Sequence, residues 1–342
     1  MYTRNPQVKT RPVTFPITHS ILDARAVGQR VTAFFGLKGH WHCELLTRGM
    51  NDVYMIRQGD TRHAIRAWRA GLHSDAAVRF ELNFLAHLKK LGIPVIEGIP
   101  APSGELFTAV DAPEGRRQLC LFPWAGGVTL AQGPTVARAH RLGAEIARIH
   151  LAGKDFRGEE PRPFGFDRTM RNKIGLLTDR LADRPDDAAF YARAAKAIVA
   201  AMEKAIPGLP AGAIHGDIHA RNAFYEGDDI QILDFDTCGE APWLHDVTCF
   251  VWANDYIALD PASAGLRNGI TEAFLKGYES VRPFTAAEKD SWNLWIAAKE
   301  LAYLCGMSGV VNVVGPGSMR NVTWDWCIDS VRRHVAAAGL TV

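Results

Sequence analysis

The residues most suited to chemistry in this sequence of 342 residues lie in one segment, His215-Gly-Asp-Ile-His-Ala-Arg-Asn222, and at Asp234 beyond it. Asp217 and Asn222 are five positions apart, and Asp234 follows Asn222 by twelve. The pattern of residues 223–234 predicts two strands joined by a tight turn, a hairpin that would bring Asn222 and Asp234 to the same end. Their oxygen atoms suit Mg²⁺, which proteins usually bind through one or two carboxylates together with substrate phosphates. Asp217, on the preceding loop, could accept a proton from a substrate hydroxyl.

The order acid, amide, acid is the order of the catalytic and metal-binding residues in kinases. The motif His-Gly-Asp-(x)4-Asn at 215–222, with Ile-Leu-Asp-Phe at 232–235, resembles the aminoglycoside phosphotransferase and choline kinase superfamily. This superfamily includes type II homoserine kinases and bacterial stress-response kinases. Protein kinases usually carry Arg at the position of Gly216 and Gly at the position of Asp236. Both departures are typical of the small-molecule branch.

The resemblance implies an α+β, two-lobed, protein-kinase-like fold with a small antiparallel-sheet N-lobe and a larger, mainly helical C-lobe. It also implies ATP and Mg²⁺ as cofactors and a small molecule as acceptor. We expect an N-terminal arm at residues 1–19, an N-lobe at 20–123 that covers the nucleotide, and a catalytic, acceptor-binding C-lobe at 124–342.

Composition excludes several classes of protein. The contents of hydrophobic residues (47%) and charged residues (22%) are typical of a globular protein, and a net charge of +2 argues against nucleic acid as a partner. The sequence has no run of about 18 apolar residues that would span a membrane, and its polar start lacks a signal core. Six cysteines without Cys-x-x-Cys spacing favour free thiols in a reducing cytoplasm. The oligomeric state does not follow from the sequence.

The expected N-lobe begins with a helix at residues 21–34, for which Ser20 is the predicted cap. Apolar residues at helical spacing predict a second helix at 76–91. The expected strands lie at 42–47, 52–57, 62–68, 95–99, 106–110 and 118–122.

Several N-lobe residues are predicted to contact the nucleotide. Gly49 and Asn51 lie in the first hairpin turn, which covers the ATP phosphates in kinases. The segment Ala64-Ile65-Arg66 resembles the Ala-Ile-Lys of the third strand in kinases, and alternation along the strand puts Ala64 and Arg66 on one face. The resemblance then implies that Ala64 lies beside the adenine and Arg66 at the phosphates. Arg66 stands in the place of the usual lysine, and its wider fork can bind two oxygens at once. Glu81 is the predicted ion-pair partner of Arg66.

The last strand of the N-lobe is expected to lead into a hinge, where backbone groups near Phe122 and Trp124 would meet the adenine edge. The C-lobe is predicted to be mainly helical, and His150 is interpreted as a packed structural residue. The expected helices lie at 136–151, 173–181, 187–205, 247–256, 266–278, 286–305 and 324–338.

Five residues near the motifs receive secondary roles from the resemblance. His215 and Asp246 are expected to support the catalytic loop. His219 and Arg221 are candidates for phosphate or acceptor contacts, with exposed loop positions as the alternative. Asp236 is either a further metal-side carboxylate or a structural replacement for glycine, and the second interpretation is preferred. A metal site from the histidines of this loop is disfavoured.

The acceptor depends on the C-terminal half. Its aromatic residues could hold a quaternary ammonium such as choline, but core packing is the preferred interpretation. These residues are Trp243, Trp252, Tyr256, Trp292, Trp295 and Tyr303. Homoserine is suggested by the stretch 277–288, which resembles type II homoserine kinases. The acids expected of an aminoglycoside pocket, Asp255, Asp260 and Glu288, are scattered.

Two other functions are weighed. A serine/threonine protein kinase would need an activation segment, but only about ten residues separate Asp234 from Trp243. A nucleotide-binding pseudokinase is suggested by the substituted lysine and the single glycine of the turn. The complete set of Asp217, Asn222 and Asp234 argues against it.

Overall fold

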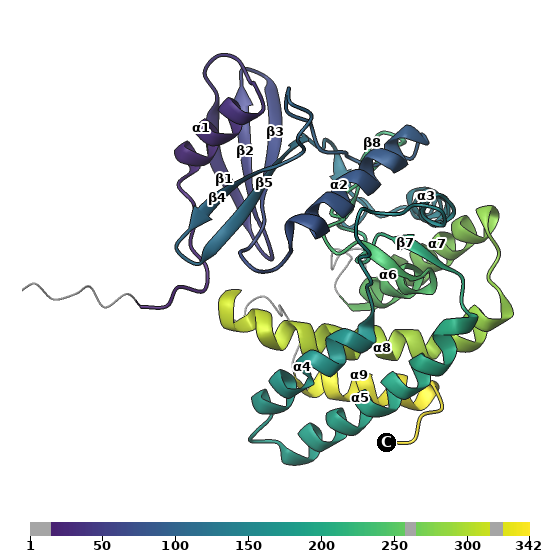
Figure 1. The fold of residues 1–342 in the computed structure, drawn as a ribbon. Helices are drawn as coiled ribbons and strands as arrows, with labels where there is room; N and C mark the ends of the chain where they lie inside the picture. Colours follow the sequence, from purple (N-terminus) through teal and green to yellow (C-terminus); the bar gives the residue numbers. More distant parts are fainter. Residues whose placement is uncertain (1–14, 257–264, 315–323) are drawn as a thin grey trace, which may run out of the picture.

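The computed structural model, which describes residues 15–256, 265–314 and 324–342, has two lobes (Figure 1). A five-stranded antiparallel sheet in the order β1-β2-β3-β5-β4 forms the smaller lobe. Its strands are β1 (His42–Arg48), β2 (Asp52–Gln58), β3 (Thr61–Ala67), β4 (Thr108–Ala112) and β5 (Gly115–Pro123). Residues 1–14 of the predicted arm lie outside the described residues.

Helix α1 (Ala24–Phe34) and helix α2 (Asp75–Lys90) pack on opposite faces of this sheet (Figure 1). On the α1 face, Val31 packs with buried side chains such as Tyr54 and Ile65. Asp23 caps α1, because its Oδ1 accepts a hydrogen bond from the backbone N of Ala26 at 2.9 Å. The prediction that Ser20 caps this helix is therefore wrong.

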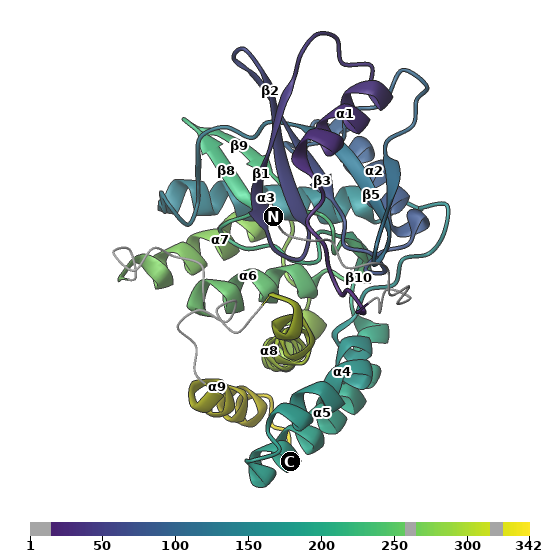
Figure 2. The ribbon, with the colours of Figure 1, turned by 90° about the vertical axis from the view of Figure 1, so that its left-hand side faces the viewer.

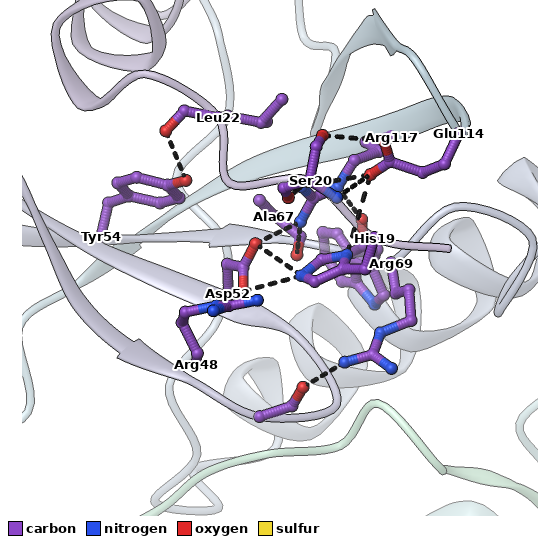
Figure 3. Close-up of polar contacts among 12 residues, drawn as sticks. His19, Ser20, Leu22, Arg48, Asp52, Tyr54, Ala67, Arg69, Glu114 and Arg117 are labelled. Carbon is purple, nitrogen blue, oxygen red and sulfur yellow. Dashed lines mark hydrogen bonds and ion pairs between the residues drawn. The ribbon is translucent and has the colours of Figure 1, made fainter. Parts of the chain in front are cut away.

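Residue Ser20 instead belongs to a buried charged cluster that joins the first described residues to the sheet (Figure 3). Its hydroxyl donates to Glu114 Oε2 at 2.7 Å. Asp52 accepts a hydrogen bond from Arg117 Nη2 at 2.8 Å and lies 3.1 Å from His19 Nε2. The side chain of His19 is only 3% exposed, so this residue packs on the N-lobe, although it was expected to lie in a loose arm.

The segment at residues 95–99 is not the predicted strand. It makes one bridge, between Val95 and Ile232, and the N–H of Ile99 donates to Leu121 O at 2.8 Å. Its backbone thus forms hydrogen bonds first with the C-lobe and then with the N-lobe, and it is not a strand of either sheet.

The larger lobe is mainly helical, as expected, and contains two small sheets (Figures 1 and 2). Its helices are α3 (Val136–Gly153), α4 (Phe166–Arg180), α5 (Pro185–Ala205), η1 (Ile206–Gly208), α6 (Leu244–Tyr256), α7 (Arg267–Val281), α8 (Ala286–Val314) and α9 (Trp324–Ala337). Strands β6 (Val128–Thr129), β8 (Ala223–Glu226) and β9 (Asp229–Ile232) form one sheet, and β7 (Ala211–Ile214) pairs with β10 (Gly239–Pro242).

Two apolar cores hold this lobe. One includes residues of α3, α6 and α7 and continues through α2 to the N-lobe sheet. The other joins α4, α5 and α9 around α8, which Figure 2 shows nearly end-on. Helix α8 ends nine residues later than predicted. Within the described part of the chain, every helix is too short or too polar to cross a bilayer, and all six cysteines are free thiols.

Candidate active site

A cavity of about 660 Å³ lies between the lobes and is lined by residues from both. Most of the predicted site residues line it. From the N-lobe and hinge these are Gly49, Asn51, Ala64, Arg66, Phe122 and Trp124, and from the C-lobe Asp217, Arg221, Asn222, Asp234 and Asp236. Four other predicted residues, Glu81, His215, His219 and Asp246, do not line it.

The β8–β9 hairpin brings Asn222 and Asp234 to one end, since the N–H of Leu233 donates to Asn222 O at 2.9 Å. The Nδ2 of Asn222 donates to Asp217 O at 3.0 Å, which leaves its Oδ1 as an acceptor. Asp234 has a φ of 66°, the one positive φ at a non-glycine residue in the described chain. Such a backbone is uncommon outside glycine and is often found at functional sites.

This pair of oxygen donors has the chemistry that suits Mg²⁺. The side chain of Asp234 is half exposed, so its carboxylate is open to the cavity. Among the described residues, no three His, Cys, Asp or Glu side chains are grouped as a metal site. Both ring nitrogens of His215 have partners, because Nε2 lies 2.8 Å from Leu233 O and Nδ1 accepts from the N–H of Asp217.

The predicted ion pair between Arg66 and Glu81 is present, with 2.6 Å between Nη1 and Oε1. The other guanidinium nitrogen, Nη2, lies 3.2 Å from Asp234 Oδ1. Glu81 is buried, and burial raises its pKa even though Arg66 lies beside it. Burial also opposes the charge of Arg66, but Glu81 and Asp234 outweigh this and raise the pKa of the guanidinium.

The first hairpin turn is joined to the C-lobe by Asn51, whose Nδ2 donates to Asp236 Oδ2 at 2.7 Å. Asp236 is buried, and burial together with the charge of Asp234 raises its pKa well above the usual carboxyl range. Asp236 does not have a positive φ, so its backbone conformation does not require the glycine found here in protein kinases.

The catalytic-loop segment depends on Gly216. Its φ is 92°, and a Cβ at this position would lie 2.3 Å from Thr237 O. Gly216 therefore allows the loop to approach the segment after β9 and to turn into Asp217. The side chain of Asp217 is 42% exposed, and the residue lines the cavity.

A buried polar chain supports this loop from behind. Asp246 accepts hydrogen bonds from the backbone N–H groups of His215 at 2.8 Å and Gly216 at 2.7 Å. His150 Nε2 lies 3.0 Å from the same carboxylate, and its Nδ1 lies 2.8 Å from the hydroxyl of Tyr278. Burial lowers the pKa of His150, so the ring is neutral and donates one hydrogen bond to Asp246.

The stretch that resembles homoserine kinases lies at the far end of this chain of contacts. Arg282 donates to Tyr278 Oη at 2.9 Å and forms a short ion pair with Glu288. A Cβ at Gly277 would lie 1.9 Å from His140 O, which shows that α7 and α3 pack in close contact. In this structure the stretch packs and orients helices, and its buried Glu288 is not part of an acidic acceptor pocket.

Comparison with known proteins identifies the family. The model of the "Phosphotransferase enzyme family" matches residues 43–284. A Deinococcus radiodurans protein of uncharacterised function is 30% identical over 312 residues, 90% of each chain. The chain belongs to the phosphotransferase enzyme family. As a member of it, the chain is an ATP-dependent phosphotransferase with an alcohol group as acceptor.

Other relatives of this phosphotransferase carry more specific names. The homoserine kinase of Paraburkholderia phytofirmans is 30% identical over 233 residues, which cover 62% of this chain and 64% of that protein. Two solved structures share the kinase-like fold at 16% and 19% identity. The amicoumacin kinase hAmiN has a TM-score of 0.71 and 93% of each chain covered, and a microcompartment-associated aminopropanol kinase has a TM-score of 0.70, with 93% of this chain and 99% of that chain covered.

Two residues that contact the candidate site were missed by sequence analysis. Lys299 Nζ lies 3.0 Å from Asp217 Oδ1. Arg162 donates to the carbonyl of Asp236 through a short hydrogen bond and to Ala77 O at 3.1 Å, so it joins α2 to the segment after β9. The sequence held one indication for Lys299. It lies in an apolar helical stretch, and because a buried lysine is seldom without a partner, an ion pair could have been expected there.

The remaining predicted residues are placed as follows. His219 Nδ1 accepts from the backbone N–H of Arg221 at 3.2 Å, and its Nε2 lies 3.8 Å from Asp217 Oδ2. Trp243, Trp252 and Trp295 are buried, and Trp292 and Tyr303 pack against the α8 core, as expected for core residues. The side chains of Tyr256, Asp255 and Asp260 lie outside the described residues.

Proposed function

We propose that this enzyme transfers the γ-phosphoryl group of Mg²⁺–ATP to a hydroxyl of a small molecule in the cavity between the lobes. The observation that carries the proposal is that Arg66, Asn222, Asp234 and Asp217 converge on that one cavity. Phosphoryl transfer needs this arrangement, because the protein acts mainly by positioning the reactants and neutralising charge on phosphate oxygens.

The nucleotide would lie beneath the N-lobe sheet, with its adenine near Ala64 and the hinge at Phe122–Trp124. Arg66, oriented by Glu81, would contact phosphate oxygens. Asn222 Oδ1 and the Asp234 carboxylate would hold Mg²⁺, which when bound neutralises charge on the β and γ phosphates. Gly49 and Asn51 would cover the phosphates from above.

Residue Asp217 would orient the acceptor hydroxyl and accept its proton. As the bond from the acceptor oxygen to phosphorus forms, the bond to the ADP oxygen breaks, and the proton passes to the carboxylate. Burial opposes ionisation of Asp217, but Lys299 and His219 hold its pKa below the usual carboxyl value, so it is ionised at neutral pH. Such a weak base suffices when proton transfer is late, since the hydroxyl becomes acidic only as the bond to phosphorus forms.

Among acceptors, a small hydroxy amino acid or amino alcohol is the favoured class, with homoserine first. Support comes from the homoserine kinase relatives at 30% identity. The described residues hold no close group of three acidic side chains of the kind that would line a pocket for a polycationic aminoglycoside. Choline at Trp252 is disfavoured, because the Lys299 ammonium already lies 5.4 Å from that ring.

The alternatives fit less well. After Asp234 the chain forms β10, which pairs with β7, and then enters α6, so this region has no long segment for docking a peptide as in a protein kinase. A pseudokinase would not need an acid, an amide and a second acid around one cavity.

The test is ADP release in Mg²⁺–ATP with homoserine, choline, ethanolamine, amino sugars, aminoglycosides and a generic protein substrate, with the Asp217→Ala variant as control. Acceptor-dependent turnover that is lost in the variant supports the proposal, and the panel names the acceptor class. Clear Mg²⁺–ATP binding without turnover on any acceptor favours the pseudokinase. Turnover on the protein substrate alone favours the protein kinase.

A further inference from the structure

Helix α8 places one lysine against the predicted catalytic acid. Lys299 is buried, and its Nζ lies 3.0 Å from Asp217 Oδ1. The two residues are 82 positions apart. The contact therefore arises from packing of α8 beneath the catalytic loop, a position that Figure 2 shows among the C-lobe helices.

The ammonium group of Lys299 lies between aromatic rings and the carboxylate of Asp217. Its Nζ lies 5.8 Å from the ring of Phe166 and 5.4 Å from the ring of Trp252. An ammonium taken out of water loses several kcal/mol of hydration unless it is paired. Within the described part of the chain, the Lys299 ammonium forms its ion pair with Asp217. The aromatic faces attract the cation only weakly, so Asp217 is its main partner.

The two oxygens of Asp217 consequently differ. Oδ1 accepts from Lys299 Nζ at 3.0 Å and from Cys249 Sγ at 3.6 Å. No described residue donates a hydrogen bond to Oδ2, and the Nε2 of His219 is 3.8 Å away. Since the carboxylate is 42% exposed, Oδ2 is the oxygen that an incoming hydroxyl can reach.

We propose that Lys299 is a positioning residue for phosphoryl transfer, which holds Asp217 by Oδ1 so that Oδ2 alone accepts the hydrogen bond and then the proton of the acceptor. This inference rests on the proposed function, in which Asp217 is the base. A carboxylate free to rotate would present either oxygen and spend less time in the productive geometry, and small misplacements of a catalytic group lower rates strongly.

The test compares Lys299→Met, which keeps most of the length of the side chain without its charge, with Lys299→Arg, which keeps the charge. The probe is Mg²⁺–ATP with homoserine, and with water as acceptor when homoserine is omitted. Lys299→Met should lower kcat by roughly 10- to 100-fold and leave the KM for ATP within about twofold, because Arg66, Asn222 and Asp234 do not contact Lys299. Lys299→Arg should recover part of the rate. Lys289→Met, an exposed lysine on the same helix, is the matched control and should match wild type.

A double-variant cycle separates positioning from general damage. In the Asp217→Asn background, Lys299→Met should change the residual rate by less than about threefold, because a residue that acts through Asp217 has nothing left to position. An equal loss in both backgrounds, or full activity of Lys299→Met, overturns the role of Lys299 alone. If Lys299→Met does not fold, Lys299→Gln takes its place in the cycle, since its amide is neutral and polar. If wild type shows no Asp217-dependent turnover of homoserine, of the other acceptors or of water, the proposed function fails and this role fails with it.

Discussion

Replacing Arg66 with methionine would leave a buried carboxylate without its partner, and we expect a large loss of stability. Glu81 is 1% exposed, its Oε1 bonds to Arg66, and its Oε2 has no hydrogen-bond partner. Breaking a buried ion pair by removing one member typically costs about 3–5 kcal/mol. The half-exposed contact of Arg66 with Asp234 adds at most about 1 kcal/mol. The expected decrease in the free energy of unfolding at pH 8 is therefore about 3–6 kcal/mol.

The loss should depend on pH with a definite sign. Because burial raises the pKa of Glu81, the folded state binds this proton more tightly than the unfolded chain. The stability linked to Glu81 is therefore fully present below the ordinary carboxyl pKa of about 4.3 and is lost as pH rises through the folded-state pKa. Removal of Arg66 raises that pKa further, so the Arg66→Met variant should be nearer to wild type at pH 5 than at pH 8.

Urea unfolding of four proteins measures this effect: wild type, Arg66→Met, Glu81→Gln and the double variant. The double variant should be more stable than Arg66→Met, because a neutral amide replaces the unpaired carboxylate. Arg57→Met, an exposed arginine on β2, should change stability by less than about 0.5 kcal/mol. If the two single effects add within about 0.5 kcal/mol, the side chains are not coupled and the reasoning is refuted.

Three further predictions concern the metal, the catalytic loop and the N-lobe. Asn222→Ala and Asp234→Ala should each weaken ATP binding in Mg²⁺ by about tenfold or more and leave binding in EDTA nearly unchanged, as calorimetric titration would measure; equal losses in both buffers would contradict the metal assignment. Gly216→Ala should abolish at least 90% of turnover, because its Cβ would clash with a carbonyl oxygen and the backbone has a positive φ; wild-type kcat would contradict this. Asp52→Ala should lower the free energy of unfolding by about 3–5 kcal/mol, because the fully buried guanidinium of Arg117 loses its nearest carboxylate, 2.8 Å away, and keeps only Glu114 at 3.8 Å; a change below about 1 kcal/mol in urea unfolding would contradict it.

Local sequence patterns predicted much of the fold. The alternation in β3 predicted that Ala64 and Arg66 share one face, which in the structure lines the cavity, and the spacing of the β8–β9 hairpin brought Asn222 and Asp234 together. These features depend on residues close in sequence, where period and turn chemistry are informative. Helix α1 shows the limit of this approach, since both Ser20 and Asp23 are cap residues by type and only tertiary contacts decided between them.

The contacts that sequence analysis missed are long-range. Lys299 meets Asp217, Arg162 meets the segment after β9, and His19 meets Asp52. None of these pairs has a periodic or motif signal, because each depends on how separate elements pack. The hydrogen bonds from residues 95–99 to both lobes have the same origin. A segment with strand-like composition does not form a strand when its hydrogen-bond partners are divided between two sheets.

The central claim is that Asp217 directs phosphoryl transfer from Mg²⁺–ATP to an acceptor hydroxyl. Phosphorus NMR of the reaction with homoserine, followed for wild type and for Asp217→Ala, tests it most directly. We predict a phosphomonoester signal that grows with ADP in wild type and is slowed by about 10²- to 10⁴-fold in the variant. A variant that forms the phosphomonoester at the wild-type rate would contradict the claim.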